Sequence, residues 1–212
     1  MFYLLENKFP PLEYADPNGL LAIGGILSSP MILNAYTNGI FPWYSEDEPI
    51  LWYSPNPRCV LFPKDVYVSK SMKQVLQRHT FDFTINTCFE DVIENCRKLR
   101  EDTGTWLGDD MIGAYTRLHN EGFAHSIEVW QNGKLVGGLY GLAIGKAFFG
   151  ESMFSLVSNS SKAALIFLCT FLDEEGFEII DCQVSNPHLL SMGAIEIDRD
   201  LFIKKLKEAI AH

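Results

Sequence analysis

Proline is distributed very unevenly along this chain, and its distribution limits the folds open to it. Eight of the ten prolines lie before residue 60 of 212. Because proline lacks an amide hydrogen and fixes φ, we expect neither a regular sheet nor a long helix in this stretch. One short helix is predicted, with Ser29 as its N-cap, Pro30 in its first turn and Gly39 at its end. The pattern therefore predicts a small irregular N-terminal module over residues 1–63.

Residues 64–212 carry regular patterns and are predicted to form a second domain. Ser69 or Ser71 is expected to cap a basic helix that ends at Arg78, and residues 81–85 alternate as a strand. Thr87 and Glu90 have the spacing of a capping box, which predicts a helix through residue 100. A helix from residue 109 or 110 to Gly122 is predicted from an apolar stripe of Met111, Ala114, Tyr115 and Leu118.

The second half of this domain is predicted to combine strands and helices. Asn132-Gly133 is a strong hairpin signal between strands at 124–130 and 134–143, and a further strand covers 146–154. Ser160 or Ser161 is expected to cap a buried helix over 163–172. A buried strand follows at 177–184, and Asp198 begins the last helix. This order of elements predicts an α/β (α+β) fold with a mixed sheet.

Composition excludes several classes of protein. With 47% hydrophobic and 21% charged residues the chain is too apolar for a disordered protein. It has no apolar run of 18 residues and no basic leader, so we expect neither a membrane span nor a secretory signal. Five cysteines without a C-x-x-C pair indicate reduced thiols and a cytoplasmic location. No histidine has metal-ligand spacing, and we expect no metal.

The net charge of −10 argues against broad nucleic-acid binding, but the charge is not spread evenly. The segment from Lys64 to His79 contains four basic residues, Lys64, Lys70, Lys73 and Arg78, and one acidic residue, Asp65. Shorter basic clusters lie at 97–100 and 204–207. Each cluster is either an ordinary solvated helix face or a surface that contacts phosphates.

Two groups of polar residues on apolar strands are candidates for chemistry. Asp181 and Gln183 are expected to project from one face of their strand and Cys182 from the other, which makes Cys182 an improbable nucleophile. Polar groups there are costly unless they pair with each other at the strand end or have a function. Glu151 lies in an aromatic strand, where it is either paired with an internal arginine or offered to a cationic ligand. Because no partner is obvious, we favour the ligand.

Glycines and loop aromatics add weaker signals. Gly137, Gly138 and Gly141 predict bulges or close approach of another chain segment to their strand. Trp43 and Trp106 lie in loop-like contexts, where aromatic rings either stack on bases or simply pack over the domain.

Taken together, these motifs resemble the leucyl/phenylalanyl-tRNA–protein transferase family, in the family's order and over nearly the whole chain. The matching segments are Asp16-Pro-Asn-Gly-Leu-Leu-Ala-Ile-Gly-Gly25, Gly39-Ile-Phe-Pro-Trp43, Ile50-Leu-Trp-Tyr-Ser-Pro55, Pro57-Arg58, Gly104-Thr-Trp106, His125-Ser-Ile-Glu-Val-Trp130, Gly150-Glu-Ser-Met-Phe154 and Ile180-Asp-Cys-Gln-Val184. The resemblance implies a GNAT-like acyltransferase domain. It also implies transfer of Leu, Phe and, less well, Met from aminoacyl-tRNA to the N-terminal Arg or Lys of proteins, which marks them for N-end-rule degradation.

The resemblance also implies roles for single residues. Asp181 and Gln183 would be the catalytic pair, Glu151 would meet the acceptor's cation, and the terminal adenosine would be held by Trp43, Trp106 and Asn186. The apolar residues of the donor pocket would be Leu139, Phe148, Met153, Leu165, Leu168, Leu172 and Ile180. Lys64, Lys70, Lys73 and Arg78 would contact tRNA phosphates. We expect a monomer that needs no cofactor.

Two departures and two alternatives accompany this resemblance. Leu156 stands where relatives carry Arg, which could remove a phosphate contact or loosen acceptor choice, and Tyr53 replaces the second aromatic of a Trp-Trp-Ser-Pro motif.

The first alternative is an acetyl-CoA-dependent N-acetyltransferase on the same fold, but the segment before the 163–172 helix lacks a glycine-rich phosphate turn. The second, a non-catalytic tRNA- or peptide-binding module, leaves Asp181 and Gln183 unexplained.

Overall fold

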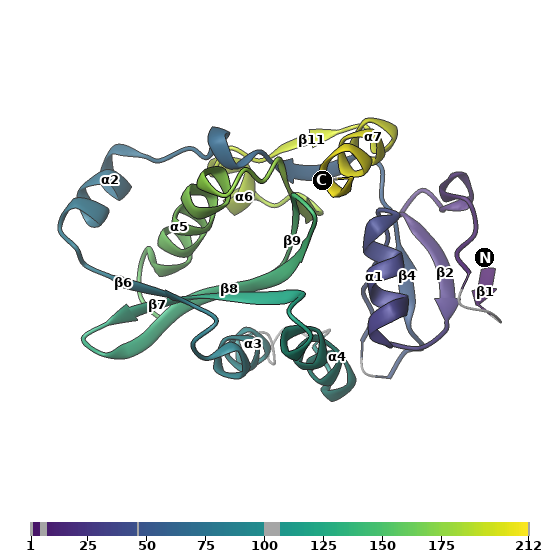
Figure 1. The fold of residues 1–212 in the computed structure, drawn as a ribbon, viewed down its shortest axis with the longest axis horizontal. Coiled ribbons are helices and arrows are strands. Elements are labelled where there is room, and N and C mark those ends of the chain that lie inside the picture. Colours follow the sequence, from purple (N-terminus) through teal and green to yellow (C-terminus); the bar gives the residue numbers. More distant parts are fainter. Residues whose placement is uncertain (1, 5–7, 46, 100–106, 212) are drawn as a thin grey trace.

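The computed structural model describes residues 2–4, 8–45, 47–99 and 107–211, which form two sheets (Figure 1). The smaller has the order β1-β2-β4-β3 and the larger β11-β5-β10-β9-β8-β7-β6. The strands are β1 (Phe2–Leu4), β2 (Leu20–Gly24), β3 (Phe41–Pro42), β4 (Leu51–Tyr53), β5 (Arg58–Leu61), β6 (Asp82–Ile85), β7 (Ala124–Gln131), β8 (Lys134–Ile144), β9 (Ala147–Ser155), β10 (Ile179–Gln183) and β11 (Ile195–Ile197). The helices are α1 (Ser29–Thr37), α2 (Lys70–Gln77), α3 (Phe89–Lys98), α4 (Asp109–Asn120), α5 (Ser160–Glu174), α6 (Pro187–Ser191) and α7 (Arg199–Ile210), with 3₁₀ turns at Leu12–Tyr14 and Pro63–Asp65.

The N-terminal region is more regular than its prolines predict. The expectation that it holds no regular sheet is wrong, because β1 to β4 form a sheet of short strands, and Pro42 is the one proline within them. Pro42 lies in β3, an edge strand, where its missing N–H breaks no internal ladder. Helix α1 begins one residue earlier than predicted, because Ser28 rather than Ser29 caps it by accepting from the Met31 amide.

Strand β5 precedes residue 63 yet belongs to the larger sheet. It lies between β10 and β11 and pairs antiparallel with both. Its four residues are all buried. The domain division at residue 63 stays a prediction, and the segment just before it is built into the larger sheet.

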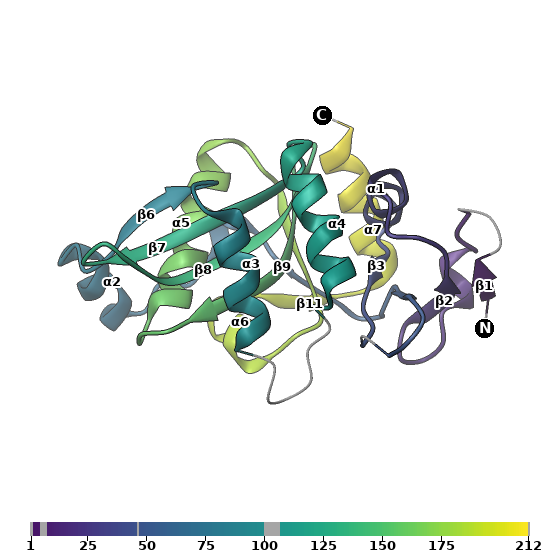
Figure 2. The same ribbon diagram turned by 90° about the horizontal axis from the view of Figure 1, so that it is seen from below.

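The larger sheet is mixed, as the order of elements predicts. β9 and β10 run parallel, while the pairings of β6 to β9 and of β10, β5 and β11 are antiparallel. Helix α5 covers one face, and α3 and α4 cover the other (Figures 1 and 2). The β7–β8 hairpin turns at Asn132 and Gly133, both with positive φ, as predicted. The buried stripe of α4 is also the predicted one.

Two predicted helix caps are wrong because tertiary partners take the groups concerned. Helix α3 begins at Phe89 after Cys88, and the Thr87 amide donates to the Glu128 carboxylate instead of joining a capping box. At α5 the N-cap is Asn159, with φ +73° and no side-chain cap bond. The Ser160 hydroxyl donates to the backbone oxygen of Val136.

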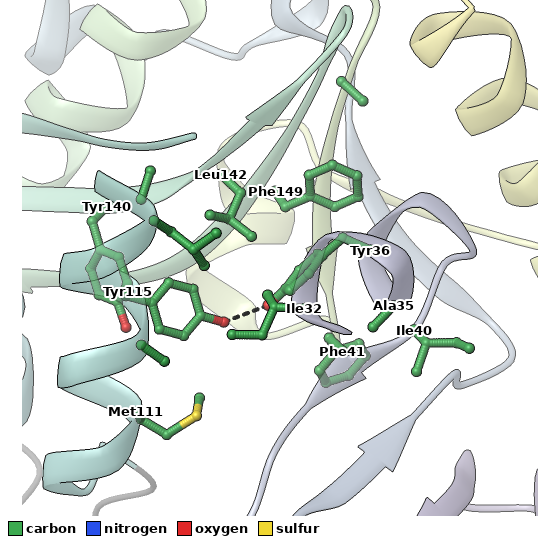
Figure 3. Packing of buried hydrophobic residues seen from close by; sticks show 14 of the residues in the cluster. Ile32, Ala35, Tyr36, Ile40, Phe41, Met111, Tyr115, Tyr140, Leu142 and Phe149 are labelled. Carbon is green, nitrogen blue, oxygen red and sulfur yellow. Dashed lines mark hydrogen bonds between the residues drawn. The ribbon is translucent and has the colours of Figure 1, made fainter. Parts of the chain in front are cut away.

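The hydrophobic core joins the N-terminal region to the larger sheet. One buried cluster contains Ile32 and Tyr36 of α1, Tyr115 of α4, Phe149 of β9 and Phe202 of α7. Figure 3 shows Ile32 and Tyr36 of α1 directed toward Tyr115 of α4 and Phe149 of the sheet. A second cluster lies on the α5 face. Within the described ranges, no helix has the length and apolarity needed to span a bilayer.

Candidate active site

The two parallel strands part at the centre of the larger sheet. Pairing of β9 with β10 ends at Phe149 and Asp181, whereas β9 continues to Ser155 and β10 ends at Gln183. A cavity of about 750 Å³ lies in this opening. Its walls come from β3, β8, β9, the α5 helix, the end of β10 and the turn into α6.

A bulge in β9 aims Glu151 at the cavity. Tyr140 pairs with Ser152 and Gly141 with Gly150, so Glu151 is an extra residue without a partner on β8. Such bulges re-aim side chains. A Cβ on Gly141 would lie 2.2 Å from the Phe149 backbone oxygen, so this position requires glycine. The predicted close approach along this strand is confirmed.

A second bulge, in β10, changes which side chains reach the cavity. Asp181 pairs with Val60 and Gln183 with Cys59, which leaves Cys182 as the extra residue, and Gln183 has φ +57°. Cys182 and Gln183 both line the cavity and Asp181 does not. The prediction that Cys182 lies on the face opposite to Gln183 is therefore wrong, because strand alternation ends at the bulge.

Asp181 is buried in an ion pair with Arg58. Its two carboxylate oxygens accept from Nε and Nη2 of Arg58, each at 2.7 Å, and both side chains are at most 1% exposed. The Arg58 guanidinium also donates to the Gly39 backbone oxygen at 3.1 Å and lies between the rings of Phe41 and Phe202. Arg58 thus joins β5, β10, the end of α1 and α7.

Gln183 reaches the cavity from beside this pair. Its backbone N–H donates to Asp181 Oδ1 at 3.0 Å, which fixes the bulge. The buried amide nitrogen of its side chain has no hydrogen-bond partner among the described residues. A polar group in this state is available to a ligand.

Glu151 is held by two phenols rather than by an arginine. The Tyr36 hydroxyl is hydrogen-bonded to its Oε1 at 2.7 Å and the Tyr115 hydroxyl to its Oε2 at 2.8 Å. Burial raises the pKa of Glu151 to about 7, while both phenols act in the opposite direction by stabilising the carboxylate. An internal arginine was one of the partners considered for Glu151. The buried arginine near it, Arg58, pairs with Asp181 instead.

The apolar side of the cavity contains most of the residues predicted for a donor pocket. Leu139, Met153, Leu165, Leu168 and Ile180 line it. Phe148 and Leu172, both 2% exposed, do not; they lie in the buried cluster behind the lining.

The three residues predicted to hold adenosine have different surroundings. Trp43 lines the cavity with 47% of its surface exposed and packs against Tyr53. Asn186 lines it as well, and its side chain caps α6 by accepting from the Leu189 amide at 2.9 Å. Trp106 falls outside the described residues.

Comparison with known proteins accounts for this arrangement. Residues 60–207 match the family model for leucyl/phenylalanyl-tRNA protein transferase, and residues 25–56 match the model for its N-terminal domain. The chain belongs to the leucyl/phenylalanyl-tRNA–protein transferase family. Proteins of that name in Yersinia enterocolitica and Flavobacterium johnsoniae are 53% and 50% identical, covering 94% and 98% of this chain and 84% and 99% of theirs. It is accordingly an aminoacyltransferase that acts from tRNA on proteins.

Two solved structures resemble the chain distantly. A GCN5-related N-acetyltransferase from Kribbella flavida covers 74% of this chain and 56% of its own, with 10% identity and a TM-score of 0.42. The structure of L-PGS from Bacillus licheniformis covers 63% of this chain and 48% of its own, with 12% identity and the same TM-score.

The basic residues predicted to contact phosphates lie outside the cavity. Lys70, Lys73 and Arg78 are exposed on or just after α2, while Lys64 is exposed in the preceding 3₁₀ turn and so lies outside the helix. In the cluster at 97–100, by contrast, Arg97 is paired with Glu94 and Asp109.

The sequence did not single out three members of the site. Arg58 stood in the Pro57-Arg58 motif without a role, and Tyr36 and Tyr115 were ordinary helix residues. Tyr115 was placed on the apolar stripe, but nothing in local spacing brings it to Glu151, 36 residues away along the chain.

Proposed function

We propose that this chain acts as a monomer and transfers leucine, phenylalanine and, less well, methionine from aminoacyl-tRNA to proteins with N-terminal Arg or Lys, which marks them for N-end-rule degradation. The observation that carries the proposal is one cavity with two kinds of wall. Apolar residues from β8, β9, α5 and β10 line it, and Glu151 and Gln183 line it at the bulges of β9 and β10.

The apolar wall suits the side chain of the donor. Leu139, Leu165 and Leu168 discriminate by size and apolarity, where one methylene is worth ~1–3 kcal/mol. Charged and β-branched donors should therefore be transferred poorly. Trp43, Asn186 and Trp106 are proposed to hold the terminal adenosine of the tRNA.

The chemical step needs little activation because the donor ester is already reactive. The acceptor's α-amine, with pKa near ~8, attacks the ester carbonyl; the C–N bond forms, the C–O bond breaks, and the nitrogen's proton ends on the released ribose oxygen. Gln183 is proposed to orient the amine through its side-chain amide. Asp181 is proposed to act through Gln183, since it reaches that residue's backbone and not the cavity.

Glu151 is proposed to bind the cationic side chain of the acceptor's first residue. It lines the cavity among apolar neighbours, where attraction between opposite charges is stronger than in water. The α2 surface (Lys64, Lys70, Lys73 and Arg78) is proposed to contact tRNA phosphates; no salt bridge among the described residues neutralises it. Replacing Lys70 and Lys73 together by Glu should weaken tRNA binding, and a wild-type dissociation constant would place the tRNA elsewhere.

One assay tests the proposed reaction against the acetyl-CoA alternative. The protein is incubated with charged Leu-tRNA and an Arg-initiated peptide in the absence of CoA, and the peptide is examined for one added leucine by mass. We expect extension with Leu-tRNA and Phe-tRNA and little with Val-tRNA, and little extension of an Ala-initiated peptide. No extension with any donor, together with acetylation when acetyl-CoA is supplied, would overturn the proposal.

A further inference from the structure

Three oxygen-bearing side chains, Tyr36, Tyr115 and Glu151, close a ring beside the cavity that Glu151 lines. The Tyr36 and Tyr115 hydroxyls are 2.6 Å apart, and each is within 2.8 Å of one oxygen of Glu151. They come from α1, α4 and β9, three elements distant in sequence. Figure 3 shows the two hydroxyls directed at each other, with their contact drawn.

The ring has three short contacts, and each needs a proton between its oxygens. Two neutral phenols supply only two protons, so with Glu151 ionised one contact would join two oxygens with no hydrogen between them. A protonated Glu151 supplies the third: it donates to one phenol, that phenol donates to the other, and the second donates back to the carbonyl oxygen. The geometry is therefore that of a neutral, protonated ring.

The surroundings agree with this proton count. Both tyrosines are fully buried, and burial beside Glu151 raises their pKa values well above the ordinary value, so the phenols keep their protons. The other charged and titratable groups facing the ring are Arg58 from β5, Asp181 from β10 and Tyr140 from β8. Arg58 and Asp181 form an ion pair whose charges oppose each other, which leaves burial as the main influence on Glu151.

We propose that Glu151 is a carboxylic acid in the empty site and that the Tyr36–Tyr115 ring makes binding of a cationic acceptor expel its proton. This inference rests on the proposed acceptor role of Glu151. When an Arg or Lys side chain arrives, its charge replaces the proton and Glu151 becomes a carboxylate. Both phenols then donate to it, and the contact between the two hydroxyls, left without a proton, opens. The ring thereby avoids an unpaired buried charge in the empty enzyme and reserves the carboxylate for a cationic acceptor.

Proton release on binding can be measured directly. An Arg-initiated peptide is titrated into the full-length protein by calorimetry at pH 6, pH 7 and pH 9, at each pH in two buffers that hold that pH and whose ionisation enthalpies differ. The dependence of the observed enthalpy on the buffer gives the number of protons released. The same titration of Glu151→Gln subtracts protons that come from the peptide's own amine.

We expect the wild type to release close to one proton more than Glu151→Gln at pH 6, about half a proton more at pH 7 and almost none more at pH 9. Between pH 6 and pH 5 the wild-type dissociation constant should rise by close to tenfold. Tyr44→Phe is the matched control, because the Tyr44 hydroxyl also donates to a carboxylate, that of Asp110, but lies outside the ring. It should leave proton release unchanged.

Two further observations keep the test decisive. If Glu151→Gln binds too weakly for calorimetry, the ¹³C shift of the Glu151 carboxyl in the wild type should move from acid to carboxylate on addition of peptide at pH 6. A carboxylate shift already present in the free enzyme, or equal proton release by wild type and Glu151→Gln, would overturn the inference. The Leu-tRNA assay on the same preparation separates the two claims: extension without extra proton release contradicts only the ring, and no extension contradicts the proposed function.

Discussion

The bulges of β9 and β10 place two carboxylates in contrasting surroundings. Asp181 is ion-paired with Arg58 and removed from the cavity, whereas Glu151 is bonded by neutral phenols and lines it. A guanidinium compensates a buried negative charge, and a phenol only solvates it. We therefore expect the first carboxylate to support the fold and the second to respond to pH and ligand. Four predictions test this contrast.

The largest effect is expected from removing the partner of Asp181. Arg58→Met leaves a buried carboxylate unpaired and should lower the free energy of unfolding by about 3–5 kcal/mol. Urea denaturation of the single variants and of the double variant Arg58→Met/Asp181→Asn measures this. The double variant should lose less than the sum of the two single losses, because no charge is left unpaired. Additive losses would contradict a tight coupling between the two side chains.

The next prediction separates support of the fold from chemistry. Gln183→Asn shortens the side chain by one methylene, and asparagine tolerates the positive φ at this position. Misplacing the amide by about 1 Å should lower the single-turnover rate of transfer by ~10². Stability and the dissociation constant for aminoacyl-tRNA should change little. A transfer rate equal to that of the wild type would remove Gln183 from the reaction.

The pH dependence of stability should distinguish Glu151 from the ion pair. Because its pKa is raised from 4.5 to about 7 on folding, the native state binds more protons than the unfolded state between these values. Stability from this residue is therefore present below pH 4.5 and is lost as pH rises through 7. Wild type should lose up to about 3 kcal/mol relative to Glu151→Gln over this window, at ~1.4 kcal/mol per pH unit. Parallel stability curves in urea from pH 5 to pH 8 would refute the shift.

What the sequence predicts well is what depends on neighbours along the chain. The stripe of α4, the hairpin at Asn132-Gly133 and the cap at Ser69 follow from local periodicity and turn chemistry, and the structure confirms them. The bulge at Cys182 and the partners of Asp181 and Glu151 depend on contacts between distant segments. The Arg58–Asp181 pair, for instance, spans 123 residues. Strand alternation alone could not reveal that Asp181 points away from the cavity that Gln183 lines.

The smallest effect is expected from changing one member of the hydrogen-bonded ring of Tyr36, Tyr115 and Glu151. Tyr36→Phe removes a hydroxyl but keeps the aromatic ring, which packs edge-on against Phe149. Tyr115 and Glu151 still bond to each other, so each keeps one partner, although Glu151 Oε1 loses its bond to Tyr36. The loss of unfolding free energy should be only about 0.5–1.5 kcal/mol, well below that of Arg58→Met. Urea denaturation at pH 6, where the neutral ring is complete, measures it, with Tyr44→Phe as the matched buried tyrosine. A loss as large as that of Arg58→Met would mean that the phenols compensate a fixed charge on Glu151, and the contrast between the two carboxylates would no longer hold.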